Sequence, residues 1–129
     1  MPRRKSRTLT EVELEFMQAV WERDEVTTED VLEHLRGRGR HLADGSVRKI
    51  LSILVAKGYL VRRPAGRAFR YKAAVAEGRA NRSMLLDLVE RAFAGSPALM
   101  MASLLDNTRM SKKDLAAIKQ LIAEKEKGQ

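Results

Sequence analysis

The sequence predicts a mainly helical fold with one small β-hairpin. Two observations lead to this prediction. Apolar residues recur at three- and four-residue spacing along most of the 129-residue chain, as on the buried faces of helices. A Pro-Ala-Gly turn at residues 64–66 joins two short segments rich in strand-forming residues. Opposite charges are also separated: residues 11–33 carry nine acids and one base, whereas residues 36–72 carry eleven bases and one acid.

The composition excludes several classes of protein. No apolar segment approaches the length that spans a bilayer, and the basic N-terminus lacks the apolar stretch of a signal peptide. The chain has no cysteine, which excludes disulfides and cysteine metal sites. We therefore expect a cytoplasmic protein with no membrane partner, in which one core-forming domain carries a helical appendage.

A capping box predicts the first helix. Thr10 and Glu13 have the spacing at which each side chain accepts a hydrogen bond from the other's backbone N–H, so a helix is expected over about 11–23. Its apolar stripe includes Trp21, which we expect in the core. The acids on its exposed face make it a poor candidate to lie along a phosphate backbone.

A short strand and a second helix follow. Val26 is expected to form a strand of one or two residues. Thr27, with Asp30 three residues later, is typical of an N-cap and starts a helix over about 28–36. His34 lies on this helix among residues that we expect to be exposed.

The third helix is expected over about 45–57, with Asp44 as its N-cap and Gly58 as the left-handed residue that ends it. One face of this helix is apolar and consists of Val47, Ile50, Leu51 and Leu54. The opposite face carries small polar and basic side chains, namely Ser46, Arg48, Lys49 and Ser52.

The hairpin follows directly, with strands at residues 59–63 and 68–72. We expect Phe69 and Tyr71 to share one strand face and to pack on the core rather than to stack on bases. The order helix, short strand, helix, helix, hairpin is that of a winged helix-turn-helix over residues 9–75, with the third helix as reader and the hairpin as wing. The wing arginines are Arg62, Arg63, Arg67 and Arg70.

The remaining region, residues 76–129, predicts three helices. The first spans about 77–94, the second starts at Ser96-Pro97, and the last is capped by Ser111. Helices this apolar on so short a segment need a partner surface, and a second copy of the chain is the simplest one. The residues expected at this dimerisation interface are Leu85, Leu88, Val89, Phe93, Leu99, Met100, Leu104, Leu115, Ile118, Leu121 and Ile122.

Three groups of residues occur in a familiar order and spacing: Glu13-Leu14, Met17 and Val20-Trp21; Ser46-Val47, Leu51, Leu54 and Lys57-Gly58; and Gly66-Arg67-Ala68-Phe69-Arg70-Tyr71. In these the chain resembles the penicillinase and methicillin-resistance repressors (BlaI/MecI/CopY type) over nearly its whole length. The resemblance implies a homodimeric transcriptional repressor with N-terminal winged helices and a C-terminal helical dimerisation domain. It also implies a dyad operator with TACA/TGTA-like half-sites, read in the major groove.

Three departures limit what the resemblance implies. In the antibiotic-resistance members, derepression follows cleavage of an Asn-Phe bond in the dimerisation domain. The matching position here is Ser103-Leu104, which has neither residue of the Asn-Phe bond. The resemblance therefore does not establish cleavage at this position, and whether a regulatory protease is a partner is left open. The copper-sensing relatives use C-terminal cysteines, which this chain lacks. Residues 1–8 form a longer basic arm, expected to be flexible, which either follows phosphates or is a frayed terminus.

The predicted partner is double-stranded DNA. Arg48 and Lys49 lie near the start of the reader helix, where side chains meet base edges, so both are assigned to base or phosphate contact, against the alternative of a solvated helix face. The guanidinium of Arg48 can contact guanine O6 and N7. Arg63 and Arg67 flank the wing turn and are the best phosphate contacts. No catalytic set, phosphate loop or cofactor site is recognisable, and the two histidines lack the companions of a metal site. We therefore expect no enzyme activity, cofactor or metal.

Two other functions stay open at this point. The winged helix could serve as a protein-interaction module whose basic face meets an acidic partner. It could also bind RNA, or coat duplex DNA without sequence preference. Equal affinity for random and operator duplexes would indicate the coat. Loss of duplex binding in an Arg48→Ala, Lys49→Ala variant that still dimerises would argue against the interaction module.

Overall fold

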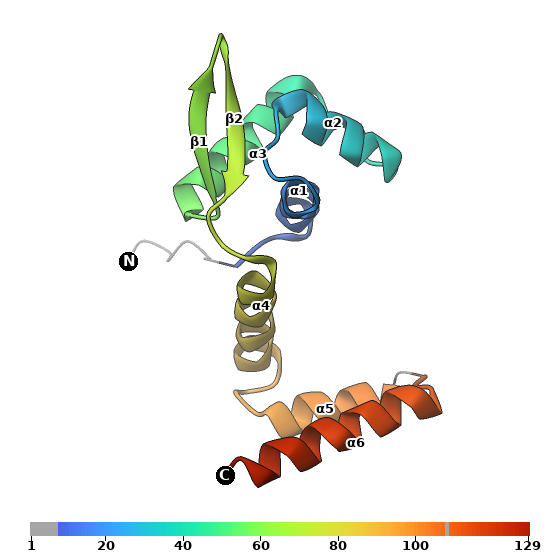
Figure 1. The fold of residues 1–129 in the computed structure, drawn as a ribbon. Coiled ribbons are helices and arrows are strands. Elements are labelled where there is room, and N and C mark those ends of the chain that lie inside the picture. Colours follow the sequence, from blue (N-terminus) through green and yellow to red (C-terminus); the bar gives the residue numbers. More distant parts are fainter. Residues whose placement is uncertain (1–7, 108) are drawn as a thin grey trace. The chain divides into compact units, whose positions relative to one another are not determined.

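The computed structural model describes residues 8–107 and 109–129 (Figure 1). Its elements are α1 (Glu11–Glu22), α2 (Thr28–Gly37), α3 (Asp44–Lys57), β1 (Leu60–Ala65), β2 (Ala68–Ala73), α4 (Glu77–Ala92), α5 (Pro97–Asn107) and α6 (Lys112–Lys127). The prediction of a mainly helical fold with one hairpin is confirmed. The basic arm predicted for residues 1–8 lies outside the described residues, apart from Thr8.

The chain divides into two compact units, and the division falls between Asp87 and Leu88, inside α4. The first half of α4 packs on the core of the first unit through Ala80 and Met84. Only the last part of α4, residues 88–92, belongs to the unit that contains α5 and α6. The expected boundary between residues 75 and 76 separates a DNA-binding domain from a dimerisation domain, whereas the division at Asp87 reflects packing within the chain. The expected boundary therefore stays a prediction.

Local hydrogen bonds explain where α1 and α2 begin. The Thr10 hydroxyl accepts from the Glu13 N–H at 3.2 Å, and the Glu13 carboxylate accepts from the Thr10 N–H at 2.9 Å. In the same way, the Thr27 hydroxyl accepts from the Asp30 N–H at 3.2 Å, and the Asp30 carboxylate accepts from the Thr27 N–H at 2.9 Å. Each capping box satisfies backbone donors that a helix start leaves without partners. The predicted starts of both helices are confirmed.

The third helix, α3, ends as predicted but begins differently. Gly58 follows it with a φ of 86°, a left-handed conformation that favours glycine. The N-cap is Ala43, which offers no side-chain hydrogen bond, so the prediction of Asp44 as N-cap is wrong. Asp44 is instead the first residue inside the helix, where the helix dipole favours its charge.

The hairpin is antiparallel, with Arg62 facing Tyr71 and Arg63 facing Arg70. Val26 forms an isolated bridge with Tyr71, with N-to-O distances of 2.9 and 2.8 Å. The short strand predicted at Val26 is therefore confirmed as a one-residue bridge. It ties the α1–α2 connection to the hairpin at Tyr71.

The core of the first unit lies where α1, α2, α3 and the hairpin meet. Trp21 packs against it half-buried, and its indole N–H donates to the Val75 carbonyl at 2.9 Å. This bond joins the end of α1 to the segment before α4. The largest fully buried side chains are Phe16, Met17, Val20, Val26, Val31, Leu35, Val47, Leu51, Leu54 and Leu60.

The two wing aromatics have different environments. Tyr71 is buried, as predicted, but Phe69 is 39% exposed, so its prediction as a core residue is wrong. Phe69 faces Pro64 near the turn, past the point where Val26 bridges the hairpin. Its ring is covered instead by Arg62, whose guanidinium carbon lies 4.5 Å from the ring centroid in a cation–π contact.

A buried ion pair joins the start of α1 to the end of α3. Lys57 Nζ lies 2.7 Å from Glu13 Oε1 and also donates to the Thr8 carbonyl at 3.2 Å. The Lys57 and Glu13 side chains are only 15% and 8% exposed. Burial opposes ionisation of Glu13, but the hydrogen bonds from Lys57 and Thr10 and the Lys57 charge together hold the pKa of Glu13 below its ordinary value.

Lys57→Met is expected to destabilise the protein most at neutral pH. Because the folded-state pKa of Glu13 is lowered, this carboxylate adds stability above its ordinary value of 4.5 and loses it as the pH falls through the folded value. Without Lys57 the buried carboxylate costs about 1–3 kcal/mol at neutral pH. Urea unfolding at neutral pH and below about pH 4 measures this difference, which should shrink in acid. A difference that does not change with pH would contradict the account.

The second unit uses side-chain caps at both of its complete helices. Ser96 accepts from the Leu99 N–H at 3.1 Å where α5 begins. Ser111 accepts from the Asp114 N–H at 3.0 Å where α6 begins. These hydroxyls satisfy backbone donors in the first turn, so both predicted start signals are confirmed.

Candidate nucleic-acid interface

The polar face of α3 is exposed. Val47, Leu51 and Leu54 are buried and mark the inner side of this helix. After Asp44 the helix contains no acidic residue, so its outer face has no fixed negative charge beyond the first turn. The four residues assigned to DNA contact are all exposed: Ser46, Arg48, Lys49 and Ser52.

The two cations of α3 have different surroundings. Arg48 is bound by Asp44 one turn back, with 2.8 Å between Nη2 and Oδ2, although both side chains remain well exposed. Exposed pairs of this kind are weak, so a phosphate or a base can replace Asp44 as the partner of Arg48. Lys49 makes no ion pair with any described residue. Lys49 can therefore bind a phosphate directly, whereas Arg48 must first exchange Asp44 for a phosphate or a base.

The wing carries three cations on one face. Arg63 and Arg70 are cross-strand partners, and Lys72 shares their face because side chains alternate along a strand. Like charges in cross-strand positions repel. Glu25, from the α1–α2 connection, reaches this face and binds Arg63, with 2.6 Å between Oε1 and Nε. Glu25 thus offsets part of the repulsion within the wing.

The wing arginines are consequently not equivalent. Arg63 is engaged by Glu25, and Arg62 lies over the neighbouring aromatic ring. Arg67 at the turn and Arg70 on β2 are exposed and make no ion pair within the described part of the chain. Arg67 and Arg70 are therefore the readiest phosphate contacts, whereas the sequence favours Arg63 with Arg67.

Glu25 is a residue of the candidate interface that the sequence analysis missed. The hydrogen bond from Arg63 lowers the pKa of Glu25, burial opposes this, and the charges of Arg63, Arg70 and Lys72 lower it further. The carboxylate is therefore ionised at neutral pH. In the sequence Glu25 is one of nine acids within residues 11–33 and does not stand out. Its place next to Val26, the predicted short strand, could have indicated that it lies beside the hairpin.

Glu25→Gln is expected to raise the affinity for duplex DNA of any sequence by about two- to fivefold. The substitution removes a negative charge beside the wing and releases Arg63 for phosphate, so the affinity should also fall more steeply with salt. Fluorescence anisotropy over a salt series measures both effects. Glu29→Gln removes an exposed acid from α2 and serves as the control. Unchanged or weaker binding by Glu25→Gln would show that Glu25 does not compete with phosphate.

Folding neutralises part of the basic segment. The cations that keep no ion pair to a described residue include Lys49 on α3 and Arg67, Arg70 and Lys72 on the wing. The charge separation in the sequence therefore overstates how much positive charge the folded surface carries. It does indicate correctly that these unpaired cations lie within residues 36–72, on α3 and the wing. The ion pairs that cross between residues 11–33 and 36–72 are Glu13–Lys57, Glu15–Arg40, Glu22–Arg38 and Glu25–Arg63.

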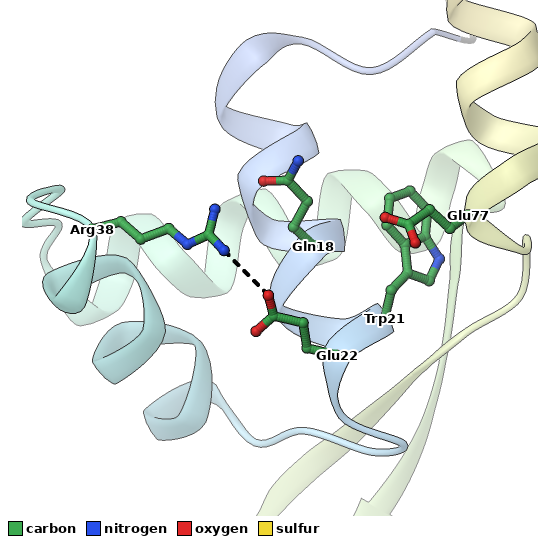
Figure 2. Close-up of a pocket in the computed structure, with 5 residues that line it drawn as sticks. All are labelled: Gln18, Trp21, Glu22, Arg38 and Glu77. Carbon is green, nitrogen blue, oxygen red and sulfur yellow. Dashed lines mark hydrogen bonds and ion pairs between the residues drawn. The ribbon is translucent and has the colours of Figure 1, made fainter. Parts of the chain in front are cut away.

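A shallow hollow lies between α1, the end of α2 and the start of α4, and Figure 2 shows its lining residues. They are Gln18, Trp21, Glu22, Arg38 and Glu77, and Glu22 binds Arg38 at 3.2 Å. The volume of about 190 Å³ is below the roughly 300–1,000 Å³ of typical ligand pockets. Its charged groups are partly paired with each other, so the hollow gives no support to a small-molecule site.

The prediction of His34 as an exposed residue is wrong, since His34 is only 9% exposed. The inner stripe of α2 runs through Val31, His34 and Leu35. Arg23 Nη1 lies 3.1 Å from His34 Nδ1, so this nitrogen accepts and the ring is neutral. Burial lowers the pKa of His34, and nearby arginines add to this against the charge of Glu22. No group of three or more His, Cys, Asp or Glu residues is placed to hold a metal within the described ranges.

Helices α4, α5 and α6 expose many apolar side chains. Val89 is an exception among the predicted dimerisation residues, because it is buried within its own chain. Phe93, Met100 and Ile118 are half-buried. The exposed ones are Leu85, Leu88, Leu99, Leu104, Leu115, Leu121 and Ile122, and the sequence analysis missed two further exposed leucines, Leu86 and Leu105. Exposed apolar side chains in such number are typical of an interaction surface.

Helix α5 bears on two further predictions. The Ser103–Leu104 bond lies inside it, and a protease could reach this bond only after the helix opens locally. Its equivalence to a cleavage site stays a prediction. No single helix of the described chain has the length and apolar character to cross a membrane; α4 and Pro97–Asp106 meet that criterion only when they are counted together across a bend.

Comparison with known proteins identifies the family. The profile of the penicillinase repressor family matches residues 9–124. An uncharacterized 16.5 kDa protein in the ptsI 3′ region of Latilactobacillus sakei is 30% identical over 117 residues, which is 91% of this chain and 80% of that protein. The solution structure of the DNA-binding domain of the repressor BlaI matches 60% of this chain and 93% of its own, with 25% identity and a TM-score of 0.50. Bacillus licheniformis BlaI, solved as a monomer with the blaP half-operator, covers 61% and 93% with 24% identity and a TM-score of 0.47. The chain therefore belongs to the penicillinase repressor family of DNA-binding transcriptional repressors.

Proposed function

We propose that this chain is a homodimeric repressor that binds a dyad operator in the cytoplasm and blocks a promoter. In each protomer α3 enters the major groove, and the wing contacts the phosphate backbone. The dimer places the two half-sites about one helical turn apart. The half-sites are TACA/TGTA-like, as the family resemblance implies.

The observation that supports this proposal most directly is the exposed face of α3 together with the wing cations that have no ion pair. Lys49, Arg67 and Arg70 can each neutralise a phosphate and release its counterions. Arg48, once it leaves Asp44, can donate two hydrogen bonds to guanine O6 and N7. Ser46 and Ser52 can bond to phosphate or base. The likeness to the DNA-binding domain of BlaI supports the same assignment.

The proposed dimer rests on the exposed apolar faces of α4, α5 and α6. A second copy can cover these faces with the same residues about a two-fold axis, which places the two winged helices symmetrically on a dyad. In this proposal residues 9–75 bind DNA and residues 76–129 dimerise. Leu86 and Leu105 join the predicted interface residues because they are equally exposed.

Nuclease footprinting on genomic fragments tests the proposal. We expect two protected half-sites about one helical turn apart. Light scattering of the complex should give the mass of one protein dimer on each dyad. Uniform protection of any duplex would indicate a non-specific coat. Absence of protection, even at low salt, would leave the winged helix as a protein-interaction module.

A further inference from the structure

Ile53 is a large apolar side chain that the core does not explain. It is 37% exposed, although it lies in the middle of α3. Its apolar neighbours Ile50 and Val55 are less exposed and pack against the core of the first unit. More than a third of Ile53 is left in water, where a partner molecule can contact it.

The neighbours of Ile53 on the helix surface are polar. With 3.6 residues per turn, positions 46, 49 and 53 lie along one strip of the helix, and position 52 lies beside it. Ser46, Lys49 and Ser52 occupy these positions, and all are exposed. Ile53 is thus an isolated aliphatic group on the face that carries the proposed DNA contacts.

The major groove contains one apolar group that such a side chain can recognise. Thymine carries a C5 methyl there, whereas cytosine, adenine and guanine present only donors and acceptors. Lys49 and Ile53 are four residues apart, about 6 Å along the helix, which corresponds to between one and two base steps of about 3.4 Å. A cationic donor and an aliphatic group at this spacing can address two different bases of one half-site.

We propose that Ile53 is a specificity-determining residue that packs against the C5 methyl of a thymine in each half-site. This inference rests on the proposed function and adds to it the base that is read and the chemical group that is recognised. Ile53 then selects thymine over cytosine, and it accepts 5-methylcytosine at the same position because the methyl is retained. Lys49 supplies affinity beside it, and the contact between Ile53 and the methyl supplies discrimination.

Single replacement of thymine by deoxyuridine tests this contact, because it removes one methyl and leaves every hydrogen-bonding group in place. The duplex is the tightest-binding one selected from a random pool, so the test assumes no operator sequence. For the unchanged protein we expect one thymine position per half-site at which the replacement lowers affinity about fourfold. Ile53→Ala should bind the thymine duplex more weakly and show no difference between thymine and deoxyuridine at that position.

Val61→Ala is the matched control, because Val61 is an exposed aliphatic residue of the same unit, on β1 rather than α3. It should keep the full difference between thymine and deoxyuridine. The inference is overturned if no thymine position loses affinity on replacement by deoxyuridine, or if Ile53→Ala still shows that loss. In either case sequence-specific binding, and with it the proposed function, would stand. If the pool yields no preferred duplex, the proposed function fails and this inference fails with it.

Discussion

Replacing Arg48 and Lys49 together by alanine is expected to lower the affinity for operator duplex by roughly a hundredfold or more. Both side chains stand on the exposed face of α3, and neither contributes to the core. The loss combines a guanidinium contact to a base, worth about 1–3 kcal/mol, with the loss of counterion release at phosphate. Fluorescence anisotropy at fixed salt measures the affinity, and circular dichroism shows whether the helices are retained.

Lys125→Ala with Lys127→Ala is the control for this double variant. It removes the same amount of positive charge from α6, outside the winged helix. We expect a change of less than about threefold, because exposed charges that make no contact with the duplex are screened at physiological salt. If the two double variants lose equal affinity, net charge rather than the face of α3 drives binding, and the proposed interface is wrong. The light-scattering mass of both variants should remain that of a dimer.

Leu51→Ala is expected to cost about 3 kcal/mol of folding free energy, within the range of about 2–5 kcal/mol for such changes in packed cores. Leu51 is fully buried in the core of the first unit. Its loss leaves a cavity that close-packed neighbours fill only partly. For a unit of this size the melting temperature should fall by roughly 10–25 °C. Thermal and urea unfolding of the full chain measure the change.

Ile53→Ala provides the comparison within the same helix. It makes a similar truncation two residues away, on a side chain that is 37% exposed rather than fully buried. Surface substitutions usually change stability by less than about 0.5 kcal/mol, so its melting temperature should stay within a few degrees of the unchanged protein. Equal destabilisation by the two variants would mean that Ile53 is a structural residue, which would contradict its role in recognition.

The parts of the fold that could be predicted depend on local sequence. The capping boxes at Thr10 and Thr27 and the cap at Ser111 involve residues three apart, so the helix starts follow from the sequence alone. The start of α3 could not be predicted in this way. Asp44 is a good N-cap by type, but as the first helical residue its charge is favoured by the helix dipole and pairs with Arg48.

The errors at the candidate site have a non-local cause. Alternation along β2 predicts that Phe69 and Tyr71 share a face, but only the contact with Val26 shows how far the core reaches along the hairpin. The pairing of Glu25 with Arg63 spans 38 residues and depends on that same contact. The assignment of individual side chains to DNA stays a prediction, since it concerns a partner rather than the chain's own packing.

The measurement that tests the central claim most directly is an anisotropy titration of two labelled duplexes over a salt series. One duplex carries a TACA/TGTA dyad, and the other carries the same bases scrambled. The account predicts that the dyad binds roughly a thousandfold more tightly, and that both affinities fall steeply as salt rises. Equal and equally salt-dependent binding to the two duplexes would contradict sequence-specific recognition of this dyad by α3.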